Sequence, residues 1–121
     1  MDKKILLVDD AAFMRMLIKD TLTKNGYTSI LEAADGEIAV QVYEAEKPDL
    51  VVMDITMPNK TGIEALGEIK GKYPEAKVIM CSAMGQEAMV VEAIKLGALD
   101  FIVKPFKPDR ILQTVSKILG T

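Results

Sequence analysis

Long hydrophobic runs, paired cysteines and blocks of like charge are all absent from this 121-residue sequence. The lone Cys81 cannot form an internal disulfide bond, and its place in the apolar segment "KVIMC" indicates a buried, inert thiol. The amino-terminal "MDKKILLVDD" has only four apolar residues after its lysines, fewer than a secretory signal needs. No run approaches the length that spans a membrane. We therefore expect a cytoplasmic protein without a membrane anchor.

The composition fits one ordinary globular domain. Fifteen basic and eighteen acidic residues give a net charge of −3, spread along the chain, so nucleic acid is an unfavourable partner. Half of the residues are hydrophobic, and the length suits one core rather than two. No linker, repeat or low-complexity segment interrupts the chain. We expect a single domain over residues 1–121 that acts as a monomer.

Short apolar runs and helix-length segments alternate five times along the chain. Most of the apolar runs are continuous rather than alternating, which is typical of parallel strands covered on both faces. Gly26, Gly97 and Pro108 punctuate the pattern. We therefore predict an α/β fold, a doubly wound parallel sheet of five strands with five alternating helices. The strands are expected at 4–8, 29–34, 50–53, 77–81 and 100–103, and the helices at 12–25, 36–46, 62–73, 87–96 and 109–119.

Polar residues follow four of these strands directly. They are Asp9 and Asp10, Asp54, Ser82 and Lys104. Each has an ordinary interpretation, because aspartate and serine cap helices or form turns, and a lysine can end a strand in solvent. Ligands of open parallel sheets, however, bind outside the carboxyl ends of the strands. Independent caps and turns would rarely place all five residues at the same kind of position, so we expect them to form one site.

Three carboxylates at one site repel one another unless some are protonated or a cation lies among them. Oxygen ligands in this number suit Mg²⁺, which keeps several waters and takes a further ligand from a phosphoryl group. Lys104 could neutralise phosphoryl oxygens and Ser82 could donate a hydrogen bond to one. One of the aspartates would then be the nucleophile.

The segments "LLVDD", "VVMDITMP", "MCSAMG" and "DFIVKPF", in this order, resemble those of bacterial response-regulator receiver domains. The resemblance runs from residue 4 to about 119, and "DDAAFMRMLIKD" and "CSAMGQ" are similar to the stand-alone chemotaxis type that lacks an output domain. It implies a flavodoxin-like sheet of order 2-1-3-4-5. It also implies that Asp54 accepts the phosphoryl group and that Mg²⁺ is held by Asp10, Asp54 and the carbonyl of Thr56, with Asp9 acting through water.

The resemblance also implies a switch. Ser82 and Lys104 would contact the phosphoryl group, the peptide bond before Pro105 would be cis, and Phe101 would be the aromatic switch residue. Two features depart from common receiver patterns: Ser82 stands where threonine is frequent, and Phe101 where some chemotaxis regulators have tyrosine. The serine lacks the methyl group that stiffens χ1, and the phenyl ring offers no hydroxyl to a partner.

By the same resemblance the chain is a phosphoacceptor signalling protein rather than an enzyme, although it catalyses its own phosphotransfer and dephosphorylation. Its partners would be a histidine kinase of the CheA type, a flagellar motor switch protein of the FliM type and, in some systems, a phosphatase. The alternatives are a phosphorelay intermediate or the isolated receiver of a longer two-component regulator. An aspartate-based phosphatase is disfavoured because Thr56 stands where its second aspartate belongs, and a flavin module because "DDAAF" would repel the flavin phosphate.

The helix expected at 87–96 is too apolar to bury all its side chains against one sheet face. A few exposed methyl groups would be an ordinary explanation. We predict instead that Val90 and Ile94, four residues apart, form an exposed apolar strip beside Phe101 that binds an amphipathic partner segment. We also expect Thr56 and Met84 to flank the path of the water that hydrolyses the phosphoryl group, with Met84 the larger obstacle.

Overall fold

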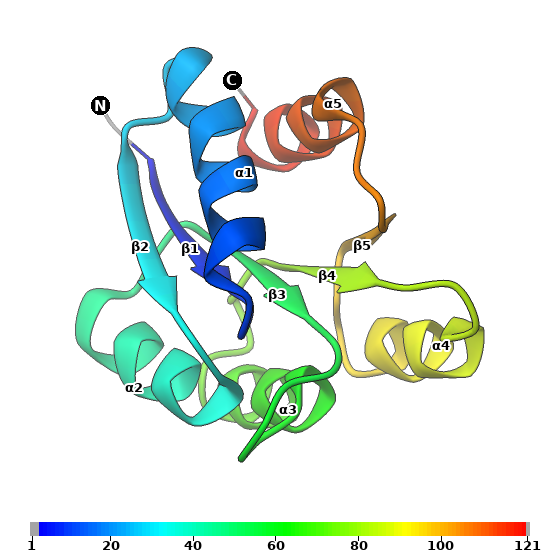
Figure 1. Cartoon of the computed structure of the whole chain (residues 1–121). Coiled ribbons are helices and arrows are strands. Elements are labelled where there is room, and N and C mark those ends of the chain that lie inside the picture. The colour runs from blue at the N-terminus through cyan, green and yellow to red at the C-terminus, as the bar shows by residue number, and fades with distance from the viewer. Residues whose placement is uncertain (1–2, 121) are drawn as a thin grey trace.

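The five apolar runs form five parallel strands in a computed structural model that describes residues 3–120 (Figure 1). The order of strands in the sheet is β2-β1-β3-β4-β5, as predicted. Chain order alternates strand and helix throughout, so every strand is followed by one helix. The elements are β1 (Lys4–Val8), α1 (Ala12–Lys24), β2 (Ser29–Ala33), α2 (Gly36–Glu46), β3 (Leu50–Asp54), α3 (Gly62–Lys72), β4 (Val78–Ser82), α4 (Glu87–Lys95), β5 (Asp100–Val103) and α5 (Pro108–Leu119).

The helices cover both faces of the sheet, with α1 and α5 on one side and α2, α3 and α4 on the other (Figure 1). Successive residues of a strand point to opposite faces, so each central strand supplies both cores. On β1, Leu6 and Val8 pack toward α2 and α3, whereas Ile5 and Leu7 pack toward α1 and α5. This double coverage explains why the strands are continuous apolar runs rather than alternating ones.

The predicted element ends agree with the structure to within about one residue, and two of the small shifts matter. Asp54 is the last residue of β3 and Ser82 the last residue of β4, rather than the first residues beyond those strands. Their backbones therefore belong to the sheet, which fixes the positions of their Cα and Cβ atoms. Cys81, one residue earlier in β4, is a buried free thiol whose pKa is raised by burial, as the sequence predicts.

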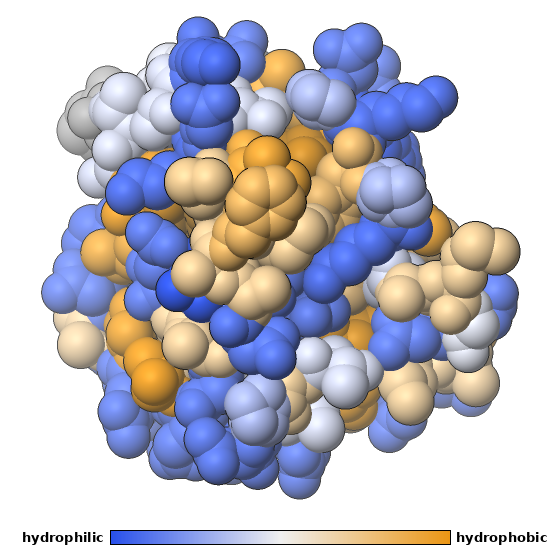
Figure 2. All heavy atoms as spheres, viewed as in Figure 1, coloured by the Kyte–Doolittle hydropathy of each residue, from blue (hydrophilic) through white to orange (hydrophobic). Residues whose placement is uncertain are grey.

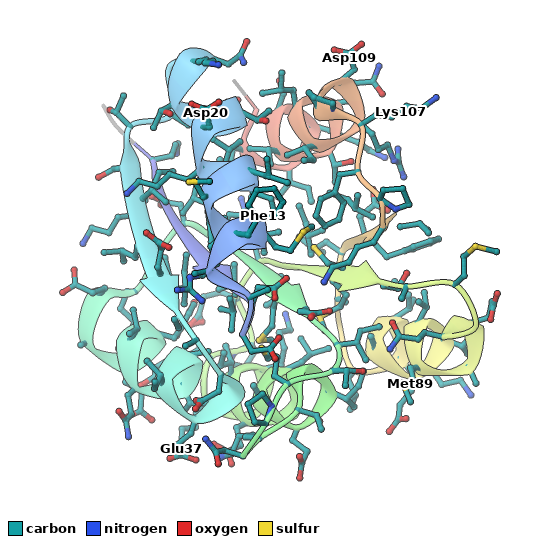
Figure 3. All side chains as sticks on the ribbon, viewed as in Figure 1. Phe13, Asp20, Glu37, Met89, Lys107 and Asp109 are labelled. Carbon is teal, nitrogen blue, oxygen red and sulfur yellow. The ribbon has the colours of Figure 1, made fainter. Side chains whose placement is uncertain are left out.

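Helices α1 and α4 each expose apolar side chains to solvent. On α1, Ile18 and Leu22 are buried, but Phe13, Met16 and Leu17 are exposed. Figure 2 shows the resulting apolar surface in the middle of one face, and Figure 3 places Phe13 there. Met89 of α4 is exposed as well.

Within residues 3–120, no helix combines the length and the apolar character needed to cross a membrane.

Candidate functional site

The polar residues predicted to converge do so at the carboxyl edge of the sheet. Strand register brings them together: Val8, just before Asp9, pairs with Met53, just before Asp54. Asp54 in turn lies opposite Cys81 of β4, and Ser82 lies opposite Val103 of β5. The strand ends of β1, β3, β4 and β5 therefore form one continuous rim, as the order of the sheet requires.

Three carboxylates form an acidic cluster on this rim. Ligand oxygens of Asp9, Asp10 and Asp54 all lie within 4.8 Å of one another. Asp9 and Asp54 are buried and Asp10 is exposed. Carboxylates held this close repel one another, and a hard divalent cation with oxygen ligands would relieve that repulsion. The cluster has the donor atoms and the spacing to hold a metal ion.

The Lys104 ammonium group lies between two of the carboxylates. Its Nζ is 3.0 Å from Oδ2 of Asp9 and 3.1 Å from Oδ2 of Asp54. Lys104 directly follows β5, at the opposite end of the rim from the aspartates that follow β1. Among residues 3–120, it supplies the only ammonium group within ion-pair distance of these two carboxylates. This lysine already offsets part of the negative charge of the cluster.

Burial and charge shift the pKa of both partners. Burial raises the pKa of Asp54 above its usual range, and the neighbouring Asp9 charge adds to the effect, while Lys104 opposes it. Burial alone would lower the pKa of Lys104. Its hydrogen bond to Asp9 and its attraction to Asp54 outweigh that effect, so the pKa of Lys104 is raised. The lysine is therefore a firmly charged group beside a carboxylate whose ionised form is disfavoured.

Backbone groups orient the two buried carboxylates. Asp9 Oδ1 accepts a hydrogen bond of 2.9 Å from the Ala11 N–H, and Asp54 Oδ1 accepts one of 2.9 Å from the Ile55 N–H. Arg15 of α1 donates to the Asp9 carbonyl oxygen at 2.5 Å. The N-cap of α1 is Ala11, without a side-chain cap. Asp9 thus binds the backbone just before α1 as well as Lys104 on the rim, and neither Asp9 nor Asp10 is the N-cap residue of the helix.

The loop after β3 is positioned by residues outside the set predicted above from the sequence. A Cβ on Gly62 would overlap the Asp54 carbonyl oxygen, and a Cβ on Gly36 would overlap the Lys60 carbonyl oxygen. Asn59, in a left-handed conformation, donates to Asp35 at 2.8 Å. The sequence does carry one signal for this arrangement: "TGIE" is a capping box, and Thr61 and Glu64 form it at the start of α3.

Thr56, the expected carbonyl ligand, lies two residues after Asp54 and is exposed. Its hydroxyl oxygen accepts a hydrogen bond of 2.8 Å from Nε2 of Gln86, a residue that also lies outside the predicted set. Met84, expected to flank the site, is 87% exposed in the loop after β4. The two residues predicted to control water access therefore lie on neighbouring loops at the rim.

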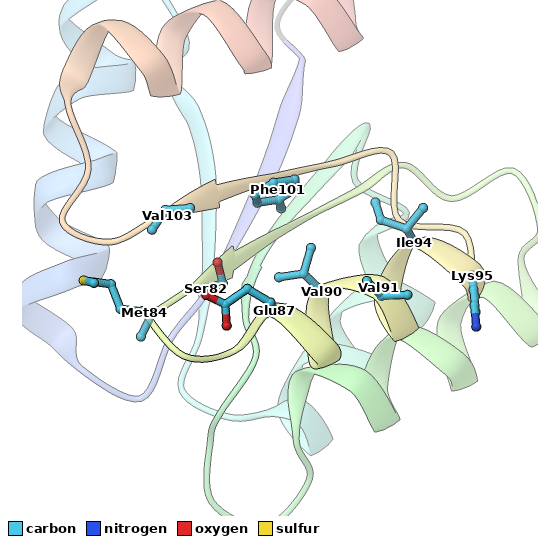
Figure 4. A pocket seen from close by; sticks show the side chains of 10 residues that line it. Ser82, Met84, Glu87, Val90, Val91, Ile94, Lys95, Phe101 and Val103 are labelled. Atoms are coloured by element: carbon cyan, nitrogen blue, oxygen red, sulfur yellow. The ribbon is translucent and has the colours of Figure 1, made fainter.

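An apolar cavity of about 510 Å³ lies next to the rim, between α4 and β5 (Figure 4). Ser82 is a buried lining residue of this cavity, and Phe101, which also lines it, is 36% exposed. The Lys104–Pro105 peptide bond that follows β5 is cis. The cavity is lined by Ser82, Ala83, Met84, Glu87, Val90, Val91, Ile94, Lys95, Phe101 and Val103.

The strip predicted on α4 is only partly exposed. Ile94 is 45% exposed and lines the cavity, as expected. Val90 also lines the cavity but is half-buried and packs against the core on the α2–α3 side of the sheet. Val90 is therefore only partly available to a partner, because one part of its side chain packs against the core and another lines the cavity.

Comparison with known proteins places these features in context. The family model described as the response regulator receiver domain matches residues 5–116. The chain is 58% identical over 118 residues to the chemotaxis protein CheY of Thermotoga maritima, covering 98% of each chain. It is 58% identical over 120 residues to CheY of Bacillus subtilis, covering 99% of this chain and all of that one. The crystal structure of the NtrX receiver domain from Brucella abortus superposes with a TM-score of 0.91 at 37% identity, covering 98% and 99% of the two chains.

Proposed function

Because the chain belongs to the response regulator receiver family, we propose that it is a chemotaxis regulator that is phosphorylated on Asp54 by a histidine kinase. One observation carries the choice of residue. Asp9 and Asp54 are both buried and each receives a backbone N–H on Oδ1 and the Lys104 ammonium on Oδ2, but Asp54 ends β3, the strand that lies between β1 with its two aspartates and β4 with Ser82. It is thus held in one orientation at the point where positive charge can collect.

In the proposed reaction, an Asp54 carboxylate oxygen attacks the phosphorus atom of a phosphohistidine. The O–P bond forms as the N–P bond breaks, and the electron pair of that bond stays on the imidazole of the donor. Asp54 must be ionised to attack, and Lys104 favours that form against the effect of burial. Asp10, Asp54 and the Thr56 carbonyl would hold Mg²⁺, with Asp9 acting through water; when bound, the ion supplies positive charge against the phosphoryl oxygens.

The phosphoryl group would change the contacts around it. Lys104 would exchange its contact with the Asp54 carboxylate for one with a phosphoryl oxygen, and the Ser82 hydroxyl would donate to another. Movement of Ser82 toward Asp54 would free space for the Phe101 ring to turn inward. Hydrolysis of the acyl phosphate by water would then return Asp54 to its carboxylate form and end the signal.

The partners follow from this role. The phosphodonor would be a kinase of the CheA type and the receiver of the signal a motor switch protein of the FliM type, both cytoplasmic, with a phosphatase as a third possible partner. The single domain, residues 1–121, would act as a monomer that binds the output partner in trans. The partner surface would be the apolar cavity beside Val90, Ile94 and Phe101, since its shape depends on the position of the ring.

Labelling with radioactive acetyl phosphate and Mg²⁺ tests the phosphoacceptor. We expect one phosphoryl group per chain in the wild type and in Asp20→Asn, a matched change on the exposed side of α1, and none in Asp54→Asn. Chelation of Mg²⁺ should also prevent labelling. A label that persists in Asp54→Asn, or that moves to Asp9 or Asp10, would contradict the assignment.

Binding of an amphipathic peptide from a FliM-type motor switch protein tests the output surface. Ile94→Asp should weaken the binding of the phosphorylated protein at least tenfold, about 1.4 kcal/mol, without affecting Asp54 labelling. Ile94 is the sharper choice because Val90 is partly core, so Val90→Asp would also destabilise the fold. Unchanged affinity in Ile94→Asp would place the output surface elsewhere.

A further inference from the structure

One side chain joins the two loops that border Asp54. Oε1 of Gln86 accepts a hydrogen bond of 2.6 Å from the Ala83 N–H, in the loop after β4. Nε2 of the same amide donates at 2.8 Å to the hydroxyl oxygen of Thr56, in the loop after β3. Ala83 directly follows Ser82, and Thr56 follows Asp54 by two residues. A single amide thus connects the loop that carries the expected hydroxyl with the loop that carries the expected carbonyl ligand.

This link is not an ordinary helix cap. Gln86 is the N-cap residue of α4, yet its side chain makes no cap hydrogen bond to that helix. The amide is directed toward the two loops, with both its acceptor and its donor in use. Holding a long polar side chain in one rotamer costs conformational entropy, which the two hydrogen bonds must offset. The link therefore fixes the loops relative to each other rather than the start of α4.

The link ties the loop after β4 to Thr56 and to the start of α4, and so opposes the movement expected on phosphorylation. If Ser82 moves toward Asp54, the Ala83 N–H must move with it, because the two residues share a peptide bond. The hydrogen bond to Gln86, already 2.6 Å long in an amide that Thr56 also holds, would then lose its resting geometry unless α4 followed. We propose that Gln86 is a positioning residue that holds the loop after β4 in its resting place and so restrains the switch. This inference rests on the phosphorylation of Asp54 proposed above.

The restraint has a definite sign. Interactions present in only one of two conformations shift the population toward that conformation, so removing them favours the other. A net gain of roughly 1 kcal/mol per hydrogen bond, less at an exposed site, corresponds to a population change of about three- to tenfold. A protein freed of the link would visit the Ser82-inward conformation more often and would accept a phosphoryl group faster.

Gln86→Met tests the restraint, because methionine has a similar length and cannot form either hydrogen bond. With acetyl phosphate and Mg²⁺, its initial rate of Asp54 labelling should exceed that of the wild type three- to tenfold. Gln41→Met, the same change at an exposed position of α2, should leave the rate unchanged. Gln86→Glu should show no increase, since its carboxylate can still accept from the Ala83 N–H and from the Thr56 hydroxyl.

A second measurement needs no phosphate. In ¹⁵N relaxation dispersion, Gln86→Met should raise the minor-state population at the amides of Ser82 and Ala83, whereas Gln41→Met should not. A role confined to local folding would lower the melting temperature and leave both the labelling rate and the dispersion unchanged. An unchanged or slower rate in folded Gln86→Met, or unchanged dispersion, would overturn the restraint. Failure of the wild type to become labelled would instead overturn the phosphorylation of Asp54, and the dispersion experiment would still decide the role of Gln86.

Discussion

Helices α3 and α4 lie side by side on the same face of the sheet, yet they are attached to it very differently. In α3, Gly62, Ala65, Leu66 and Ile69 are buried, and a complete capping box closes its first turn. In α4, Ala93 is the only buried residue, and the N-cap side chain forms no cap. Elements with few buried contacts open at lower free energy than well-packed ones. The comparison indicates that one helix anchors the site while its neighbour remains free to respond.

The strand beneath α4 explains the contrast. The central strands bury both faces, but Phe101 and Val103 of β5, which line the cavity, remain exposed. The cavity between α4 and β5 keeps apolar side chains of the two elements apart, so α4 buries less apolar surface than α3 does. Apolar burial stabilises a fold by roughly 25 cal/mol per Å², so the shortfall at α4 is a shortfall in local stability.

The largest expected effect is at the start of α3. In Gly62→Ala, the new Cβ would overlap the Asp54 backbone, which cannot move without disturbing β3, so unfolding free energy should fall by at least about 3 kcal/mol. Gly67 of the same helix faces open space, and Gly67→Ala should stabilise by about 0.5 to 1 kcal/mol. Urea denaturation measures both. Equal effects at the two glycines would show that α3 is not fixed at Asp54.

Truncating one apolar side chain in each helix compares their packing directly. Leu66→Ala removes a fully buried side chain of α3 and should cost about 3 kcal/mol. Ile94→Ala removes a half-exposed side chain of α4 and should cost less than about 1 kcal/mol. Urea unfolding gives both values. Similar losses would mean that α4 is as firmly packed as α3, and the contrast between the helices would not hold.

The cap of α3 has a smaller effect. Thr61→Ala removes the acceptor for the Glu64 N–H and should lower the unfolding free energy by about 1 kcal/mol. Gln86→Ala, at the corresponding position of α4, removes no cap but removes two exposed hydrogen bonds to Ala83 and Thr56, so its cost should not exceed that of Thr61→Ala. Thermal unfolding with both variants at one pH would measure the difference. A larger loss for Gln86→Ala would reverse the order proposed for the two helix starts.

The Asp54 carboxylate, beside the start of α3, gives a prediction about the pH dependence of stability. Burial raises the pKa of Asp54 in the folded protein, so the folded protein binds the Asp54 proton more tightly than the unfolded chain does. The free energy of unfolding therefore falls as the pH rises from the unfolded-state pKa to the folded-state pKa of Asp54. Asp54→Asn should therefore be more stable than the wild type at pH 7. The gain should disappear well below about pH 4, where the aspartate is protonated in both the folded and the unfolded state. A variant less stable at pH 7 would mean that the Lys104 ion pair outweighs burial.

The sequence predicts the fold closely because its signals are local. Continuous apolar runs identify the strands, and residues such as Gly26, Gly97 and Pro108 mark where helices end or begin. The convergence of the acidic cluster with Lys104 also follows from the sequence, since parallel strands place their carboxyl ends on one edge.

The residues that the sequence does not reveal depend on how separate loops approach each other. The contact of Gly62 with the Asp54 carbonyl and the bonds of Gln86 to two loops exist only in three dimensions. The half-burial of Val90 is hidden for another reason. Helix α4 is apolar on most of its surface, so its periodicity does not show which face meets the sheet.

The two tightly seated glycines, Gly36 and Gly62, have a consequence for how such sequences change over generations. Any single-base replacement of a glycine codon by that of another amino acid introduces a Cβ, and at these positions a Cβ would overlap the backbone of the loop or strand beside it. Both glycines should therefore persist in descendants that have lost phosphorylation, since they are retained for folding. Asp54 should drift freely in those descendants. Among related genes, a retained glycine pair without the aspartate would identify a receiver that still folds but no longer signals through phosphate.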